Sequence, residues 1–227
     1  MKPLFPAPPL EAAGLNRHVV FDIDTLPPEI GKTLDAPGQQ LILIGHAGRQ
    51  LWTSVKAVGM TGSDLIDDFT VQTVQSWFAE QLPGHSYQIL YPGNCLIGLQ
   101  ALGKLAGWHR DSLFMLGIDP FWGSWQAYRA LVVADTNFSA ILPVDRQQAS
   151  PCATCPDAPC IQHCPAGALS RSGEFALRLC LDYRRQPESA CRYTCLARLA
   201  CPVGREHRYD ADQLRHTYAQ SLKMIGA

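Results

Sequence analysis

Eight cysteines gather in one stretch of this 227-residue sequence, between residues 151 and 202. Cys164 and Cys201 are each followed directly by proline, and the other six are Cys152, Cys155, Cys160, Cys180, Cys191 and Cys195. Thiolates are ligands both for zinc and for iron–sulfur clusters, so this stretch could bind metal. The ninth cysteine, Cys95, stands alone before an apolar segment, where we expect a small buried side chain and not a ligand.

The spacing of the first four cysteines resembles the Cys-x2-Cys-x2-Cys-x3-Cys-Pro run of two-cluster bacterial ferredoxins. Four residues instead of two separate Cys155 from Cys160. In ferredoxins each Cys-Pro cysteine ligates the cluster of the other half. The resemblance therefore implies two 4Fe–4S clusters, one on Cys152, Cys155, Cys160 and Cys201, the other on Cys164, Cys180, Cys191 and Cys195. We expect a helix after Cys164-Pro165 to direct Cys164 toward the second cluster.

Three other interpretations of the cysteines stay open. Disulfides need an oxidising compartment, and the N-terminus MKPLFPAPPL lacks the layout of a signal peptide, so we expect reduced thiols and a cytoplasmic location. Structural zinc favours two separate Cys-x2-Cys pairs, and one such pair occurs here. A cluster domain that has lost its metal is the third, because the spacing is altered. The nearby arginines could tune an anionic cluster or lie on a solvated surface: Arg171, Arg178, Arg184, Arg185, Arg192, Arg198, Arg205 and Arg208.

The composition is that of a globular chain with little net charge. Hydrophobic residues make up 47% of it, which suffices for a core, and the formal net charge is −1. Because there is no long basic run, binding of nucleic acid through phosphate neutralisation is not favoured. No apolar stretch approaches the roughly 20 residues that a membrane-spanning helix needs. We therefore expect neither nucleic acid nor a membrane as a partner.

Hydrophobic periodicity predicts the elements that must position these residues. We expect an extended arm over 1–14, strands at 18–23, 40–44, 87–91, 113–118 and 128–134, and helices at 70–82, 96–107 and after Asp210. Gly98 to Lys104 matches the phosphate-loop pattern, but Leu105 replaces the required Ser or Thr, so we predict a core helix there. These elements favour an α+β fold: an N-terminal α/β module over 1–148 and a cysteine-rich module over 149–227 that ends in a helix.

Eight polar or aromatic residues could line a cofactor pocket formed by the N-terminal module. Two belong to a glycine-flanked turn, and the others lie in turns or loops near predicted strand ends. Ordinary packing or solvent exposure would explain each of them as well. The candidates are His46, Arg49, Tyr91, Asn94, His109, Ser112, Ser124 and Trp125.

Residues 101–134 and 151–202 together resemble the epoxyqueuosine reductase family, which is related to corrinoid-dependent reductive dehalogenases. The similarity lies in the order of short motifs: Ala106-Gly107-Trp108, Ser112-Leu113-Phe114, Gly123-Ser124-Trp125, Leu131–Asp135 and a lone Cys180 between the two cysteine groups. The resemblance implies a nitroreductase-like, cobalamin-processing type of N-terminal module followed by a two-cluster ferredoxin-like module. It also implies a cobalamin held between them.

Two departures bear on the activity. The family has an acidic proton donor in the turn that corresponds to Tyr91–Cys95, and this turn contains no carboxylate. No Asp-x-His-x-x-Gly cobalamin motif occurs either. If the chain is an enzyme, we therefore expect an iron–sulfur oxidoreductase other than epoxyqueuosine reductase itself.

Three functions remain in competition. The first is electron transfer through two 4Fe–4S clusters to or from an unidentified partner protein. The second is a corrinoid-dependent reductase in which the clusters reduce a cobalamin that acts on a small-molecule substrate. The third is a non-redox, corrinoid-handling or binding protein whose clusters are structural.

Overall fold

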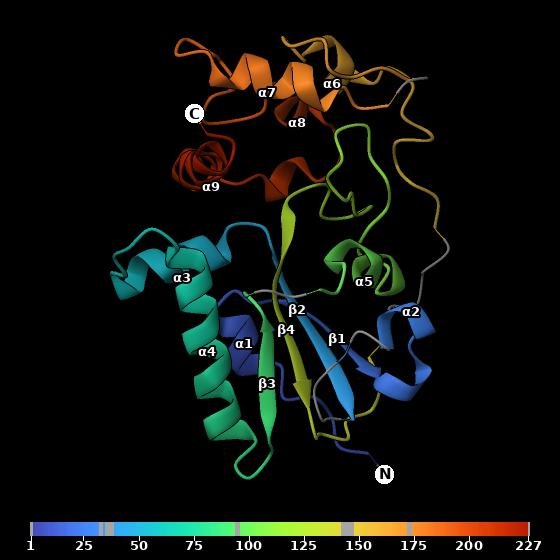
Figure 1. Cartoon of the computed structure of the whole chain (residues 1–227), viewed down its shortest axis with the longest axis vertical. Coiled ribbons are helices and arrows are strands. Elements are labelled where there is room, and N and C mark those ends of the chain that lie inside the picture. Colours follow the sequence, from blue (N-terminus) through green and yellow to red (C-terminus); the bar gives the residue numbers. More distant parts are fainter. Residues whose placement is uncertain are drawn as a thin grey trace. The chain divides into compact units, whose positions relative to one another are not determined.

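The computed structural model describes residues 2–31, 34, 39–93, 96–141, 148–171 and 174–226. The chain forms two compact units (Figure 1). The first unit comprises Met1–Gly107 and Gln126–Gln147, and the second comprises Trp108–Trp125 and Gln148–Ala227. The segment from Trp108 to Trp125, which the sequence analysis assigned to the N-terminal module, therefore packs with the cysteine-rich region. Asn94 and Cys95 lie outside the described residues.

A four-stranded antiparallel sheet forms the centre of the first unit, so the predicted combination of helices with a sheet is confirmed. Its strands are β1 (Arg17–Asp22), β2 (Gln40–Ala47), β3 (Tyr87–Tyr91) and β4 (Gln126–Ala134), in the order β1-β2-β4-β3. These are four of the five predicted strands. β2 is buried along its whole length and extends three residues beyond the predicted end at Ile44, because Gly45 to Ala47 continue to pair with β4.

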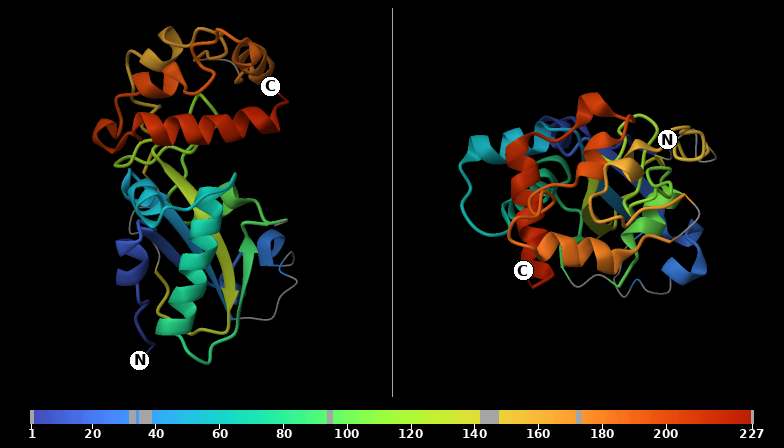
Figure 2. Two further views of the ribbon diagram at one scale, coloured as in Figure 1. Left: turned by 90° about the vertical axis from the view of Figure 1, so that its left-hand side faces the viewer. Right: turned by 90° about the horizontal axis from the view of Figure 1, so that it is seen from above.

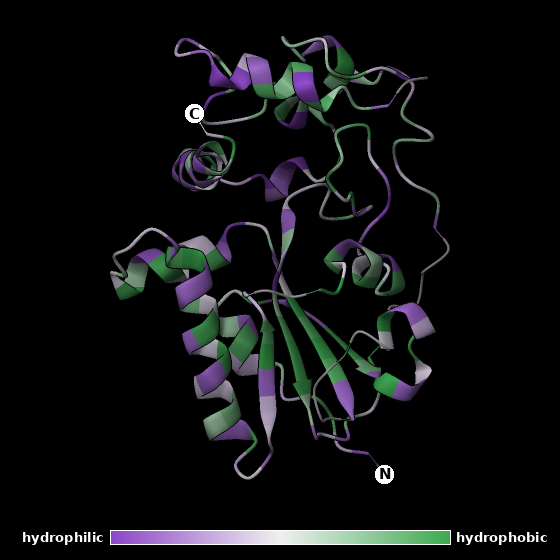
Figure 3. Cartoon of the chain, in the orientation of Figure 1, coloured by the Kyte–Doolittle hydropathy of each residue, from purple (hydrophilic) through white to green (hydrophobic). Residues whose placement is uncertain are grey.

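Helices α1 (Pro8–Ala12), α3 (Gln50–Val58) and α4 (Leu65–Gln81) pack around one core with the sheet, as the views in Figure 2 show. α4 begins five residues before the predicted start. The expected extended arm is wrong, because Phe5 and Leu10 are buried in this core and Pro8 begins a helix, where proline is tolerated. In Figure 3 strands β2 and β4 are mostly green, which marks their hydrophobic residues, whereas α4 carries both green and purple residues. A short helix, α2 (Pro28–Gly31), and a 3-10 turn, η1 (Ile23–Thr25), follow β1.

Helix α5 (Leu99–Leu105) confirms the predicted helix but begins after Leu96, which is exposed. A Cβ atom on Gly103 would lie 1.8 Å from the Tyr128 hydroxyl oxygen, so any other residue there would force the Tyr128 ring to move. Gly103, the second glycine of the segment that matches the phosphate-loop pattern, therefore allows α5 to pack closely against Tyr128.

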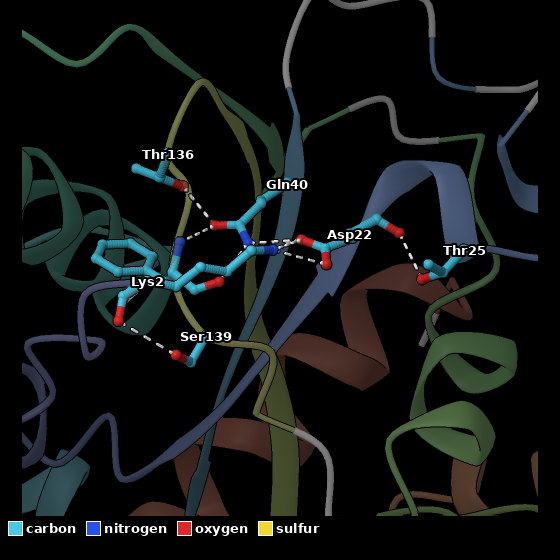
Figure 4. Close-up of polar contacts among 7 residues, drawn as sticks. Lys2, Asp22, Thr25, Gln40, Thr136 and Ser139 are labelled. Atoms are coloured by element: carbon cyan, nitrogen blue, oxygen red, sulfur yellow. Dashed lines mark hydrogen bonds and ion pairs between the residues drawn. The ribbon is translucent and has the colours of Figure 1, made fainter.

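The buried side chain of Gln40, at the start of β2, forms hydrogen bonds with Asp22 of β1 and with the segment that follows β4 (Figure 4). Its side-chain Nε2 donates to Asp22 Oδ1 at 2.7 Å and to the Phe138 carbonyl at 2.9 Å. Its Oε1 accepts from Thr136 Oγ1 at 3.0 Å and from the Phe138 N–H at 2.8 Å. The amide is thus fully hydrogen-bonded, as a buried polar group must be to avoid a desolvation cost.

The second unit consists of short helices and loops: α6 (Pro159–Gln162), α7 (Leu177–Arg185), α8 (Leu196–Ala200), the 3-10 turn η2 (Arg205–His207) and α9 (Ala211–Met224). Asp210 caps α9 as predicted, with Oδ1 accepting from Gln213 N at 2.8 Å. The strand predicted at 113–118 is wrong, because the chain turns there and Met115 has φ 62°. The helix expected after Cys164-Pro165 is also wrong: a turn follows, with Gly167 at φ 60°.

Within the described part of the chain, none of the helices has the length and apolar character that a membrane crossing requires.

Candidate metal centres in the cysteine-rich unit

The second unit holds eight described cysteines, and each of them is a free thiol. Short helices position half of these thiols. Cys160 lies on α6 and Cys180 on α7, whereas Cys195 and Cys201 lie at the two ends of α8. α6 and α8 pack side by side (Figure 1), so residues distant in sequence reach the same region.

Four thiols line one small cavity of about 20 Å³, and we call them the first quartet: Cys152, Cys155, Cys160 and Cys201. The rest of this wall is apolar and includes Ile118, Ala158 and Val203. Burial raises the pKa of the Cys160 thiol, and the thiols of Cys201, Cys152 and Cys155 raise it further. Burial also raises the pKa of Cys201, with the thiols of Cys152 and Cys155 acting in the same direction.

The other four thiols line a cavity of about 440 Å³, and we call them the second quartet: Cys164, Cys180, Cys191 and Cys195. Burial raises the pKa of Cys180 to about 11, and the other three thiols of the quartet contribute in the same direction. The pKa of Cys191 is raised for the same reason, with Cys195 and Cys164 as neighbours. The wall includes the apolar side chains of Leu169, Phe175 and Leu181 and two arginines, Arg184 and Arg198.

Phe114 lines both cavities and belongs to the apolar cluster that contains Cys160. Cys160 and Cys164 are close in sequence but face different cavities, because the turn after α6 separates them. The two quartets have the membership that the resemblance to ferredoxins implies. Ligation of a metal by either quartet stays a prediction.

Among the described residues, no group of three or more His, Cys, Asp or Glu side chains is arranged closely enough to hold a single metal ion. The distances between the thiols of a quartet can be too long for one metal ion and still suit a cluster that all four of them bind. In a 4Fe–4S cluster the four thiolates bind four different iron atoms, so their sulfurs lie further apart than the ligands of one ion.

The candidate pocket residues of the first unit lie in different environments. His46 is buried within β2, not at a turn, and its Nδ1 accepts from Arg129 Nε at 3.0 Å. Tyr91, at the end of β3, has its pKa raised by burial and lies in the field of Arg129 and Asp67. Arg49 is exposed at the start of α3. Asn94 lies outside the described residues.

The remaining candidates belong to the second unit. His109 is buried, with Nε2 3.7 Å from Asp111 Oδ1, and the Ser112 hydroxyl donates to the Leu116 carbonyl at 2.5 Å. Ser124 and Trp125 are buried against Arg198. None of the seven described candidates lines either cysteine cavity. Their assignment to a cofactor pocket stays a prediction.

Sequence reasoning missed one group of charged residues, which lies around Arg129. Arg129 lies on β4 and contacts both His46 and Asp67, with Nη1 3.4 Å from Asp67 Oδ1. Burial raises the pKa of Asp67, and Arg129 opposes that change. A charged residue within the apolar run YRALVVA was the available signal. Arg184 and Arg198 were recognised as cationic neighbours of the cysteines, but the sequence did not distinguish them from surface arginines.

Comparison with solved structures shows that this fold is similar to that of epoxyqueuosine reductases and reductive dehalogenases. No protein-family model and no curated protein sequence matches the chain. The structure is similar to epoxyqueuosine reductase from Bacillus subtilis, with a TM-score of 0.53 and 14% identity over 89% of this chain and 66% of that one. An epoxyqueuosine reductase in complex with a modified tRNA stem loop matches 91% of this chain and 66% of its own, with a TM-score of 0.54 and 14% identity.

A reductive dehalogenase described as B12-dependent also matches, with a TM-score of 0.53, 14% identity, and coverage of 93% of this chain and 33% of that one. The chain thus spans about two thirds of the reductases and one third of the dehalogenase. The resemblance predicted from the sequence is confirmed at the level of the fold.

Proposed function

We propose that this chain is an iron–sulfur redox protein that binds two 4Fe–4S clusters and exchanges electrons with a partner protein. The observation that carries this proposal is the division of eight cysteines into two cavities, each lined by four thiols. A 4Fe–4S cluster is held by four cysteine thiolates, so the two quartets fit two clusters with no ligand left over. When bound, the clusters would supply one-electron oxidation and reduction.

The backbone around the first quartet also fits an anionic group. The backbone N–H groups of Ile161 and Val203 donate to the sulfurs of Cys160 and Cys201. Hydrogen bonds to sulfur stabilise thiolates and tune the metal that they hold. Burial raises the pKa of four of the thiols, those of Cys160, Cys180, Cys191 and Cys201, and so favours their protonated form. Cluster binding must therefore release protons.

The test is metal and sulfide analysis of anaerobically purified and reconstituted protein, together with its visible spectrum. The proposal expects a brown protein with about eight iron and eight sulfide atoms per chain. Stoichiometric zinc without iron would replace the proposal with a structural zinc protein. Protein that stays empty after reconstitution would indicate a domain that has lost its metal.

A second candidate is a corrinoid-dependent reductase in which the clusters reduce a bound cobalamin that acts on a small-molecule substrate. The fold similarity to a dehalogenase described as B12-dependent favours it. Asp67 and Tyr91 are two described residues that could hold a proton for such a reaction, because burial raises the pKa of both. Equilibrium dialysis against hydroxocobalamin under anaerobic conditions tests this candidate. Tight binding in a stoichiometry of one per chain supports it, and no binding removes it.

A third candidate is a corrinoid-handling protein whose clusters are structural. Clusters that survive purification but cannot be reduced and reoxidised would favour this function over electron transfer. Reversible reduction by dithionite, followed in the visible spectrum, would exclude it.

A further inference from the structure

Two buried arginines line the cavity of the second quartet. Arg184 lies on α7 and is 8% exposed, and Arg198 lies on α8 and is 6% exposed. Both belong to the same compact unit as the eight cysteines. Arginine is rarely buried without a charged partner, so the surroundings of these two side chains are informative.

Arg198 is held by neutral and aromatic groups. Its Nε donates to Ser124 Oγ at 3.2 Å and its Nη2 donates to the Ser124 carbonyl at 2.5 Å. Its guanidinium carbon lies 4.3 Å from the centre of the Trp125 ring and 5.0 Å from that of Tyr209. The residues predicted as cofactor contacts, Ser124 and Trp125, thus hold this guanidinium in place. The backbone N–H of Arg198 also donates to Cys195 Sγ at 3.4 Å.

Arg184 is less completely bonded. Its Nη1 donates to Ser221 Oγ at 3.0 Å, and its Nη2 donates to the Tyr218 carbonyl at 3.4 Å. The guanidinium lies 5.1 Å from the Tyr218 ring centre, and the buried Nε has no hydrogen-bond partner among the described residues. Arg184 is also the cation whose field opposes the raised pKa values of Cys180 and Cys191.

Neither arginine pairs with a carboxylate in the part of the chain that the structure describes. Taking a guanidinium out of water is costly unless an opposite charge lies nearby. The cavity that both side chains line therefore fits an anionic occupant. A 4Fe–4S cluster with four thiolate ligands carries net negative charge, so it would supply the missing counterion.

The first quartet has a different electrostatic environment. No charged side chain lines its cavity in the described residues. Two arginines lie near it, but Arg171 is exposed and donates to the Cys155 carbonyl at 3.1 Å, whereas half-buried Arg208 donates to the Cys201 carbonyl at 3.3 Å. Solvent screens these two charges more than it screens buried ones.

Hydrogen bonds to sulfur do not distinguish the two quartets. The first receives backbone N–H bonds from Ile161 and Val203, and the second receives them from Leu196 and Arg198. Net charge, hydrogen bonds to sulfur and exposure are the main terms that set the potential of such a cluster. Among the described residues, both quartets thus receive backbone hydrogen bonds, and Arg208 acts on Cys201 from a half-buried position. The two guanidinium groups that are buried in the wall of the second cavity are the difference on which we build.

We infer that Arg184 and Arg198 raise the reduction potential of the cluster in the second quartet above that of the cluster in the first. Reduction adds one electron and makes a cluster more negative, so a buried cation favours the reduced form. One electron would then pass from the reduced first cluster to the oxidised second cluster. The first cluster is thereby oxidised, and the second is reduced by one electron. The inference rests on the proposed function, and it assigns the second quartet as the site where a single added electron resides.

The test is an anaerobic redox titration of the reconstituted full chain, followed by electron paramagnetic resonance. Cys180→Ala identifies the signal of the second cluster by its loss. Arg184→Gln removes one buried charge, Arg184→Lys keeps it, and Arg178→Gln removes an exposed charge from the same helix as a matched control. Iron and sulfide are measured first in each variant, so failure of cluster binding is separated from failure of the inference.

We expect the second cluster of the unaltered protein to be reduced first. Arg184→Gln should disfavour its reduction by tenfold or more, which is about 59 mV for a one-electron couple, without moving the first cluster. Arg184→Lys should show a smaller change, and Arg178→Gln should show none. Two loaded clusters whose potentials do not respond to Arg184→Gln would overturn the inference. If Arg184→Gln does not fold, loaded Arg184→Lys and the order of reduction in the unaltered protein still decide it: a first cluster that is reduced first would also overturn it.

Discussion

Cys160 and Cys201 line the same cavity, although Cys164 is far nearer to Cys160 in sequence and lines a different one. The packing of α6 against α8 produces this relationship, because Cys160 lies on α6 and Cys201 directly follows α8. A cysteine that leaves its local loop to join a distant one is the feature that links the two halves of a two-cluster ferredoxin.

The grouping of the quartets predicts which substitutions damage the same cluster. Cys201→Ala and Cys152→Ala should each cause loss of the cluster in the first quartet and leave the cluster in the second largely intact. Cys180→Ala should do the reverse. Iron content and the paramagnetic resonance spectrum of each reduced variant measure this. Equal damage to both signals by every variant would show that the quartets do not hold separate clusters.

Cys95 provides a control for the ligand count. It lies outside the described residues and is not one of the eight cysteines that make up the two quartets, and the sequence predicts a small buried side chain there. Cys95→Ala should therefore keep full iron and sulfide content after reconstitution. Loss of half the iron on this change would mean that the quartets contain a wrong member.

Much of the first unit could be predicted because its strands are short apolar runs between turn residues. β3 matches its predicted range, whereas β2 continues past Ile44 because Gly45 and His46 pair with β4. That pairing depends on a neighbouring strand distant in sequence, so local patterns could not reveal that His46 is buried. The run at 113–118 was apolar for another reason: Phe114 packs in the core around the cysteines.

The cysteines of the candidate site could be predicted because their spacing in the sequence follows a known pattern of cluster ligands. The Cys-Pro pairs pointed to the quartets, although the expected helix after Cys164 does not form. The burial of Arg184 and Arg198 was not predictable, because helices α7 and α8 are short and their exposed faces depend on tertiary packing. Arginine in such a helix looks the same in sequence whether it is solvated or buried.

Gln40 should contribute strongly to the stability of the first unit. Gln40→Ala removes four hydrogen bonds and leaves the buried Phe138 N–H without its partner. We expect a loss of roughly 2 kcal/mol or more in the free energy of unfolding, measured by urea denaturation. Gln39→Ala changes the exposed neighbouring residue and should have little effect. Equal effects of both changes would contradict the role assigned to the buried amide.

Gly103 and Tyr128 should be energetically coupled. A Cβ atom at residue 103 would lie 2.5 Å from Tyr128 Cζ as well as close to its oxygen, so Gly103→Ala must displace the ring. We expect a cost of about 1–3 kcal/mol in the free energy of unfolding. The cost should largely disappear in a Tyr128→Ala background, which a double-mutant cycle measures. Additive effects would show that the ring does not limit this approach of α5.

His18 should make the protein sensitive to mild acid. Burial lowers its pKa, against the opposing hydrogen bond with the Leu15 carbonyl at 2.5 Å. Below the ordinary value of about 6.5, protons bind His18 more readily in the unfolded chain. Stability is therefore lost as the pH falls from about 6.5 toward the lower folded pKa. Denaturation midpoints at pH 7 and pH 5 should fall less in His18→Gln than in the unaltered protein, and an equal fall would refute this source.

The central claim is that two quartets hold two separate iron–sulfur clusters. Anomalous X-ray diffraction at the iron edge, from crystals of anaerobically reconstituted protein, tests it most directly. The account predicts two iron peaks per chain, one contacted by Cys152, Cys155, Cys160 and Cys201 and the other by Cys164, Cys180, Cys191 and Cys195. A single peak that joins Cys160 to Cys164, or a zinc peak in place of iron, would contradict it.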